Sequence, residues 1–223
     1  MPRLMPVPLP WRSKSFEIVG QDAIKFDYKG TQASGKEGKI KVQNVTNSVY
    51  TARKWLRKAN GIVGADVTHW PQHVKDAYLL YFKSMPAAGV ELEAVRTVLS
   101  ATRVGVGNPM VIAAICRWRG ESGSSTQGYV RGGVGRIHVS LKYFKTGSDQ
   151  VEQVCIVVHE ATHKFANTED HAYFGEPDWL SLTHVEAVDN ADSFCYFVRD
   201  INNGELSTAV EDDDDFGIGS LFD

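Results

Sequence analysis

The sequence predicts an α+β domain that is mainly helical, with a small antiparallel sheet and a β-meander at its N-terminus. Residues 15–43 alternate apolar and polar side chains, as strands do, whereas most later segments repeat apolar side chains every three or four residues. With 223 residues, 43% apolar and 23% charged, the chain is long enough for one ordinary domain with appendages. We expect a β-meander extension over 1–43, a main domain over 44–204 and an acidic tail over 205–223.

The expected elements follow from these two periodicities and from the residues that interrupt them. The meander strands surround Phe16, Ile24 and Ile40, with glycine-containing turns between them. Asn44 is an N-cap candidate for the first helix and Gly61 its C-terminal stop. Later helices are expected from Pro71, over about 90–103, over 150–165 and over about 179–202, and a strand is expected over 136–144. The apolar run 109–118 fits either a buried strand or a short helix.

Composition limits the classes of partner. No basic stripe interleaves with aromatic residues, so no nucleic acid is expected, and the longest apolar runs are too short for a membrane span. The N-terminal residues have no apolar signal region, so we expect synthesis in the cytoplasm without a signal peptide. Export by a non-classical or dedicated secretion system stays open.

Cys116, Cys155 and Cys195 are too few for a disulfide framework and are expected to be buried thiols.

The charge is concentrated at the C-terminus. The chain carries a net charge of −3, but residues 205–223 hold seven acidic residues and no basic one, so the rest carries +4. Such a run is usually a solvated end. The alternative is a segment that docks on a partner, because the apolar sequence FGIGSLF follows the acids.

The segment VVHEATHKF contains His-Glu-x-x-His at His159, Glu160 and His163. Residues four apart lie on one face of a helix, so the two imidazoles aim at a common point with the carboxylate beside it. This arrangement is typical of zinc hydrolases. Coincidence on a solvated helix is the alternative, but the apolar sequence VCIVV before the motif indicates a buried helix, where unpaired His and Glu would be costly. We therefore predict one Zn²⁺ per chain.

A catalytic zinc takes three protein ligands, so the motif needs a third. Ala166 and Glu169 stand where the metzincin extension requires Gly and His, which excludes that class. Glu186 has the spacing of a gluzincin ligand but no other support. Asp170 is favoured, because Asn167 can adopt the left-handed conformation that ends a helix and lets the chain fold back. The candidates that follow the motif are Asp170, His171, His184 and Glu186.

These residues resemble the signature of the aspzincin metallopeptidases, the family of deuterolysin and the peptidyl-Lys metalloendopeptidases. That signature is His-Glu-x-x-His followed by Gly-Thr-x-Asp-x-x-Tyr-Gly. Here Asn167 replaces the first Gly, and Phe174 is inserted before Gly175. A second family element, Asn-Ala-Asp-Ser, is similar to residues 190–193. The resemblance covers about 44–203.

The resemblance implies a zincin-like fold and a zinc endopeptidase that acts on protein or peptide substrates. Zinc would be bound by His159, His163 and Asp170. Glu160 would act as the general base, and Tyr173 would hydrogen-bond the developing oxyanion.

The resemblance also bears on specificity. In the peptidyl-Lys branch two acidic residues line the pocket for the residue after the scissile bond; the first matches Asp192, whereas the second falls at Cys195. One carboxylate compensates a buried ammonium less fully than two, so we expect a partial preference for basic residues. The alternative is that Asp192 orients a neighbouring backbone group or histidine. The strand expected over 136–142 is where zincins pair an extended substrate.

Two other functions stay open: a metal-stapled protein-interaction module without catalysis, and a zinc amidase or deamidase. A structural zinc is usually closed by four protein ligands, so the presence of Glu160 and Tyr173 favours the enzyme. Secreted fungal members carry signal and pro-segments with paired cysteines. The chain looks more similar to a bacterial form of the domain, such as a toxin or effector delivered by a dedicated apparatus.

Overall fold

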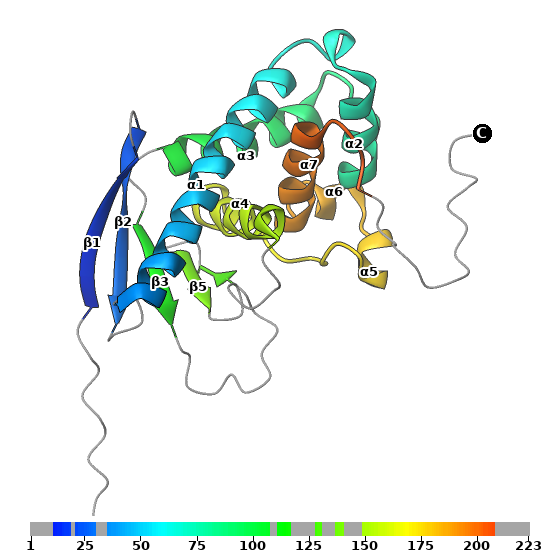
Figure 1. Cartoon of the computed structure of the whole chain (residues 1–223). Helices are drawn as coiled ribbons and strands as arrows, with labels where there is room; N and C mark the ends of the chain where they lie inside the picture. The colour runs from blue at the N-terminus through cyan, green and yellow to red at the C-terminus, as the bar shows by residue number, and fades with distance from the viewer. Residues whose placement is uncertain are drawn as a thin grey trace, which may run out of the picture.

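The computed structural model of the protein consists of a five-stranded sheet beside a group of helices (Figure 1). The strands gather at one end of the molecule, and α1 extends from them toward the helices at the other end. The residues that it describes are 11–18, 21–29, 35–107, 111–116, 128–130, 137–140 and 149–207. The elements are β1 (Trp11–Ile18), β2 (Gln21–Lys29), α1 (Gly35–Val63), a 3₁₀ turn (Val67–His69), α2 (Gln72–Phe82), α3 (Val90–Gly107), β3 (Val111–Cys116), β4 (Gly128–Tyr129), β5 (Ile137–Ser140), α4 (Gln150–Ala166), α5 (Pro177–Leu180), α6 (His184–Ala187) and α7 (Ala191–Asn203).

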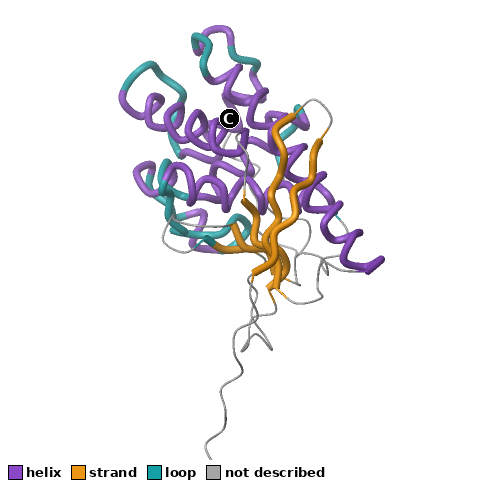
Figure 2. The backbone as a smooth tube through the Cα atoms, turned by 90° about the vertical axis from the view of Figure 1, so that its left-hand side faces the viewer, coloured by secondary structure: helices purple, strands orange, loops and turns teal. Residues whose placement is uncertain are grey.

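The predicted α+β class, mainly helical, is confirmed, but the sheet is mixed rather than antiparallel. Its order is β1-β2-β3-β5-β4, and the pairs β2–β3 and β3–β5 are parallel. Parallel pairing needs a long crossover connection, which α1, α2 and α3 provide between β2 and β3. In Figure 2, which turns the strands toward the viewer, the helices lie behind them.

The strand order also corrects the expected place for substrate pairing. The strand predicted over 136–142 is β5, which lies between β3 and β4 and has a partner on each side. The edges of the described sheet are β1 and β4. The short β4 pairs antiparallel with β5 and contacts α4, the helix that carries the His-Glu-x-x-His motif.

The N-terminal meander has two strands, and its predicted third strand is wrong. Residues 40–42 belong to α1, so the expected boundary between residues 43 and 44 falls inside a helix. An alternation of Ile40 and Val42 is too short to distinguish a strand from the exposed first turns of a helix, and Ile40 is indeed exposed. The helical period that follows is unambiguous, because the buried residues of α1 include Val45, Val49, Ala52, Leu56, Ala59 and Val63.

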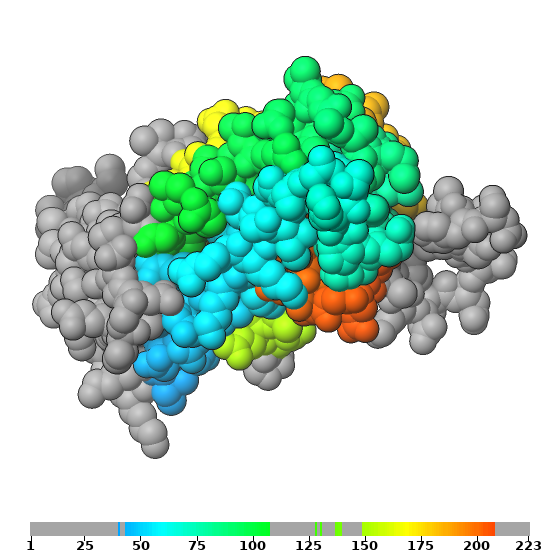
Figure 3. Space-filling model, turned by 90° about the horizontal axis from the view of Figure 1, so that it is seen from above, coloured from blue at the N-terminus to red at the C-terminus, as the bar shows by residue number. Residues whose placement is uncertain are grey.

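The motif helix α4 lies at the centre of the helical layer. It packs against α1, α3 and α7, and it buries Val154, Val157 and Ala161 completely. Gly105 of α3 lies so close to α4 that a Cβ atom there would be 2.1 Å from the Phe165 ring. In Figure 3, α1 crosses the upper face of the molecule with α3 alongside it. The motif is therefore held by a well-packed core.

Among the described residues, no helix is sufficiently long and apolar to cross a membrane.

The long helix expected over 179–202 is divided into α5, α6 and α7. A new helix starts at Thr183, whose side chain forms a capping box with Glu186. Another starts after Asn190, whose side chain is fully buried and accepts hydrogen bonds from the backbone of residues 171 and 172. The capping box at Thr183 and the loop contacts of Asn190 divide the helical segment and bring the start of α7 beside the motif.

The first residues of the predicted tail belong to the folded body. Leu206 packs against the core, and Ser207 donates hydrogen bonds from its backbone N–H and its hydroxyl to the buried Asp200. A buried carboxylate needs such partners, which explains why the body extends past residue 204. The acidic run and FGIGSLF lie outside the described residues.

Candidate metal centre

Helix α4 positions the two histidines of the motif. Asp149 caps its N-terminus by accepting a hydrogen bond from the Val151 N–H, and the helix runs without interruption to Ala166. His159 and His163 are therefore one turn apart on the same face. Their rings lie almost perpendicular, with an interplanar angle of 86° and centroids 4.7 Å apart, and their Nε2 atoms are 3.0 Å apart.

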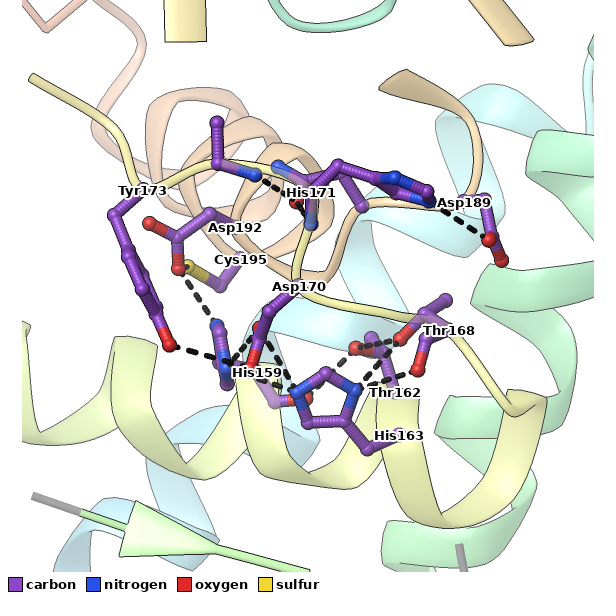
Figure 4. A network of polar contacts seen from close by, with 12 residues as sticks. His159, Thr162, His163, Thr168, Asp170, His171, Tyr173, Asp189, Asp192 and Cys195 are labelled. Carbon is purple, nitrogen blue, oxygen red and sulfur yellow. Dashed lines mark hydrogen bonds and ion pairs between the residues drawn. The ribbon is translucent and has the colours of Figure 1, made fainter. Parts of the chain in front are cut away.

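The chain reversal after α4 brings Asp170 to the same point. As predicted, Asn167 ends the helix in the left-handed conformation, with φ 58°, and its N–H bonds to the His163 carbonyl. Glu169 then forms a bridge with the segment before α7, donating to the Asp189 carbonyl and accepting from the Ala191 N–H. Figure 4 shows the result: the Asp170 carboxylate faces both imidazoles, and its Oδ1 lies 3.1 Å from each Nε2.

A second layer of acceptors orients both imidazoles. The Nδ1 of His159 lies 2.6 Å from Asp192 Oδ1, and the Nδ1 of His163 lies 2.6 Å from the Thr168 carbonyl oxygen. Both partners can only accept, so each Nδ1 carries the hydrogen and donates it. When the imidazoles are neutral, both Nε2 lone pairs therefore point toward Asp170. This is the tautomer that a metal ligand requires.

The three donor atoms fit a zinc ion. Two nitrogen lone pairs and a carboxylate oxygen converge within about 3 Å, as the cited contacts show, and imidazole with carboxylate is a ligand set that zinc accepts. Without a bound cation, the short contacts between the imidazole nitrogens and the Asp170 carboxylate need a proton on an imidazole. Burial lowers the pKa of His159, but hydrogen bonds to Asp170 and Asp192 outweigh burial and raise it to about 10. A bound zinc would replace that proton.

Glu160 lies beside this point with its side chain buried. The residue is 4% exposed, and its Oε2 has no hydrogen-bond partner among the described residues. Burial raises the pKa of Glu160 to about 7, although the neighbouring histidines act in the opposite direction. The carboxylate thus interacts with the charges of the converging donors, and one of its oxygens is unpaired among the described residues.

Tyr173 approaches the centre from the loop that follows Asp170. Its hydroxyl donates to Asp170 Oδ2 over 3.2 Å, and its ring lies nearly parallel to that of His159, with centroids 6.2 Å apart. The side chain is about half exposed. Burial and the adjacent Asp170 charge raise the pKa of Tyr173 to about 12, so the hydroxyl remains a donor at neutral pH.

Asp192 and Cys195 are buried next to His159. The Asp192 residue is 8% exposed, and its two oxygens are engaged: Oδ1 accepts from His159, and Oδ2 accepts from the Phe174 N–H over 2.8 Å. The Cys195 thiol points at Asp192 Oδ1 from 3.8 Å. Burial raises the pKa of the Cys195 thiol, so it is neutral. This geometry favours the alternative in which Asp192 orients a histidine.

The other candidate ligands have partners elsewhere. His171 pairs with Asp189 at the surface, and Figure 4 shows it turned away from the centre. His184 contacts the Phe82 carbonyl, and Glu186 belongs to the capping box at Thr183.

Two contributors were not singled out from the sequence. The Thr168 carbonyl orients His163, and the Asn190 side chain holds the loop after Asp170. Thr168 and Asn190 stand in the two motifs that carry the resemblance, but the motifs alone do not reveal which atoms act.

The comparisons with known proteins agree with this geometry. Residues 75–199, more than half of the chain, match the Aspzincin M35 family, described as lysine-specific metallo-endopeptidase. A solved structure, a zinc peptidase from Grifola frondosa, has the same fold with a TM-score of 0.58 at 19% identity. The match covers 74% of this chain and 96% of the peptidase chain. A search of curated proteins gave no significant match. The chain belongs to the aspzincin family of zinc metalloendopeptidases.

Proposed function

We propose that this chain hydrolyses peptide bonds at a zinc ion held by His159, His163 and Asp170. The observation that carries the proposal is the convergence of the two Nε2 atoms and Asp170 Oδ1, with both histidines fixed in the ligating tautomer by Asp192 and the Thr168 carbonyl. A bound zinc ion would act as a Lewis acid: it would polarise the scissile carbonyl and lower the pKa of water toward neutrality.

We assign the general base to Glu160. Within the described part of the chain, one oxygen of its buried carboxylate has no hydrogen-bond partner, so it can take a proton from water and return it to the leaving amine. Burial raises its pKa to about 7, and the positive charge of a bound zinc would lower that value again. The base would therefore be ionised at neutral pH.

Tyr173 is assigned to the oxyanion. Its hydroxyl is protonated at neutral pH and now donates to Asp170 Oδ2, the oxygen on the far side of the ligand carboxylate from the histidines. Because the side chain is half exposed, it can turn from Asp170 toward substrate without breaking core contacts. One such donor contributes about 3–4 kcal/mol to catalysis in other hydrolases.

The strand edge that would receive an extended substrate is β4. It is an edge of the described sheet and contacts the motif helix, whereas β5 already has partners on both sides. Pairing along β4 would lay the substrate backbone over Glu160.

We expect at most a weak preference for basic residues after the scissile bond. Asp192 has both oxygens occupied, and Cys195 is a neutral thiol, so neither offers a free carboxylate to an ammonium group. We assign to Asp192 the positioning of His159. Delivery as a toxin or effector stays a prediction from the resemblance.

The test is digestion of a denatured proteome by the zinc-loaded protein and by Glu160→Gln, followed by sequencing of the new termini. We expect many cut sites with the wild type and almost none with the variant, although both bind zinc. Cleavage by Glu160→Gln at the wild-type rate would contradict the assignment of the base. Zinc binding with hydrolysis of side-chain amides, and without new termini, would identify an amidase instead.

A further inference from the structure

Gly128, at the start of the edge strand β4, lies directly against the side chain of Glu160. A Cβ atom on Gly128 would be 2.9 Å from both Cγ and Oε1 of Glu160, and 3.1 Å from its Cδ. Ordinary van der Waals contact begins near 3.4 Å, so a side chain at position 128 would have to push Glu160 aside by about 0.5 Å. The backbone of Gly128 is not in the left-handed region, so the requirement for glycine is one of space.

This contact bears on how the side chain of Glu160 is oriented. Within the described ranges its Oε2 has no hydrogen-bond partner, in contrast to the two histidines, each of which is fixed by an acceptor at Nδ1. A glutamate side chain has three rotatable bonds, and restricting them costs free energy. The backbone of Gly128 lies against the outer part of this side chain and so limits the directions in which the carboxylate can turn.

We propose that Gly128 is a positioning residue for Glu160: the bare backbone of β4 serves as the wall that holds the carboxylate beside the metal centre. The inference rests on the proposed role of Glu160 as general base. Strand β4 would then have two roles: its edge would pair with substrate, and its backbone would position Glu160. A methyl group at position 128 would move the carboxylate from its working position while leaving the zinc ligands in place.

The first test is the activity of Gly128→Ala with zinc bound. Displacing a catalytic group by an ångström can reduce a rate by about 100-fold. We expect kcat to fall about 10- to 100-fold, because the predicted shift is smaller. KM should change little, and one zinc per chain should be retained. The matched control is Gly61→Ala, an exposed helical glycine of α1 with nothing within 4 Å of its would-be Cβ, which should leave kcat unchanged. An unchanged kcat in folded Gly128→Ala would overturn the proposal.

The second test is independent of peptidase activity. The melting temperature is measured for Gly128→Ala in three zinc-loaded backgrounds: wild type, Glu160→Gln and Glu160→Ala. Gln has the shape of Glu and keeps the clash, whereas Ala removes Cγ, Cδ and the carboxylate. We expect Gly128→Ala to lower the melting temperature more in the first two backgrounds than in Glu160→Ala. Equal losses in all three backgrounds would overturn the proposal. If Glu160→Gln proved active, the role of Glu160 as base would fail while this steric comparison stood.

Discussion

Replacing Asp192 by asparagine changes one atom behind His159 and leaves the side-chain volume almost unchanged. Asp192 accepts two hydrogen bonds, one on each oxygen, from His159 Nδ1 and from the Phe174 N–H. Asparagine has one acceptor oxygen, so its NH₂ group must face one of these donors. If it faces His159, it favours the tautomer with the proton on Nε2, which cannot bind the metal through Nε2; if it faces Phe174, a partly buried N–H loses its partner.

These contacts determine how much zinc affinity Asp192→Asn is expected to lose. A carboxylate that orients a metal-binding histidine is worth about 10- to 100-fold in metal affinity or activity, or about 1.4–2.8 kcal/mol. Because Asp192 is buried and its contact with His159 is short, we expect the zinc dissociation constant of Asp192→Asn to rise by about this factor. Competition with a chromogenic chelator at fixed pH measures it. Cys195→Ser is the control, since its thiol contact with Asp192 is long and weak.

A different outcome would refute the reasoning. If Asp192→Asn bound zinc as tightly as the wild type and instead lost a preference for Lys or Arg after the cut bond, Asp192 would be a specificity residue. Cys195→Glu would then be expected to strengthen that preference.

Three further predictions concern Tyr173, pH and the C-terminus. Tyr173→Phe should lower kcat by about 10²–10³-fold with zinc content and KM nearly unchanged; an equal kcat in steady-state peptide assays would remove the oxyanion role. The pKa of His159 is raised from 6.5 to about 10 without zinc, so this pairing contributes stability that is complete below pH 6.5 and is lost as the pH rises through 10. The melting temperature of the zinc-free protein should therefore fall across that range, and the zinc-loaded protein should not follow it. Deleting 208–223 should leave the melting temperature unchanged, whereas deleting 205–223 also removes the two Ser207 hydrogen bonds to Asp200 and should cost about 1–3 kcal/mol; equal melting curves would contradict this.

The sequence predicts those parts of the site whose conformation depends only on residues close to each other in the chain. The helical period aligns His159 with His163, and Asn167 is one of the few residues that take the left-handed conformation, so the helix end and the return toward Asp170 follow from local rules. The start of α2 beside Pro71 is a case of the same kind, although Pro71 stands at the N-cap, one residue before the first turn in which it was expected.

The parts that the sequence does not predict depend on contacts between distant segments. The parallel pairing of β2 with β3 joins strands separated by three helices, and no local pattern encodes it. The spacing of Asp192 and Cys195 places both on one face of α7, but only the packing of α7 against α4 decides that this face meets His159. The division of the last helical segment likewise depends on Asn190, which binds a loop from another part of the chain.

The most direct test of the central claim is the zinc content of the purified protein and of three variants, determined by mass spectrometry of the native protein. The geometry at the metal centre predicts one zinc per chain in the wild type, in Glu160→Gln and in Glu186→Ala, and none in Asp170→Ala. The assignment would be contradicted if Asp170→Ala kept its zinc while Glu186→Ala lost it, because the third ligand would then lie in α6 instead of the loop after α4.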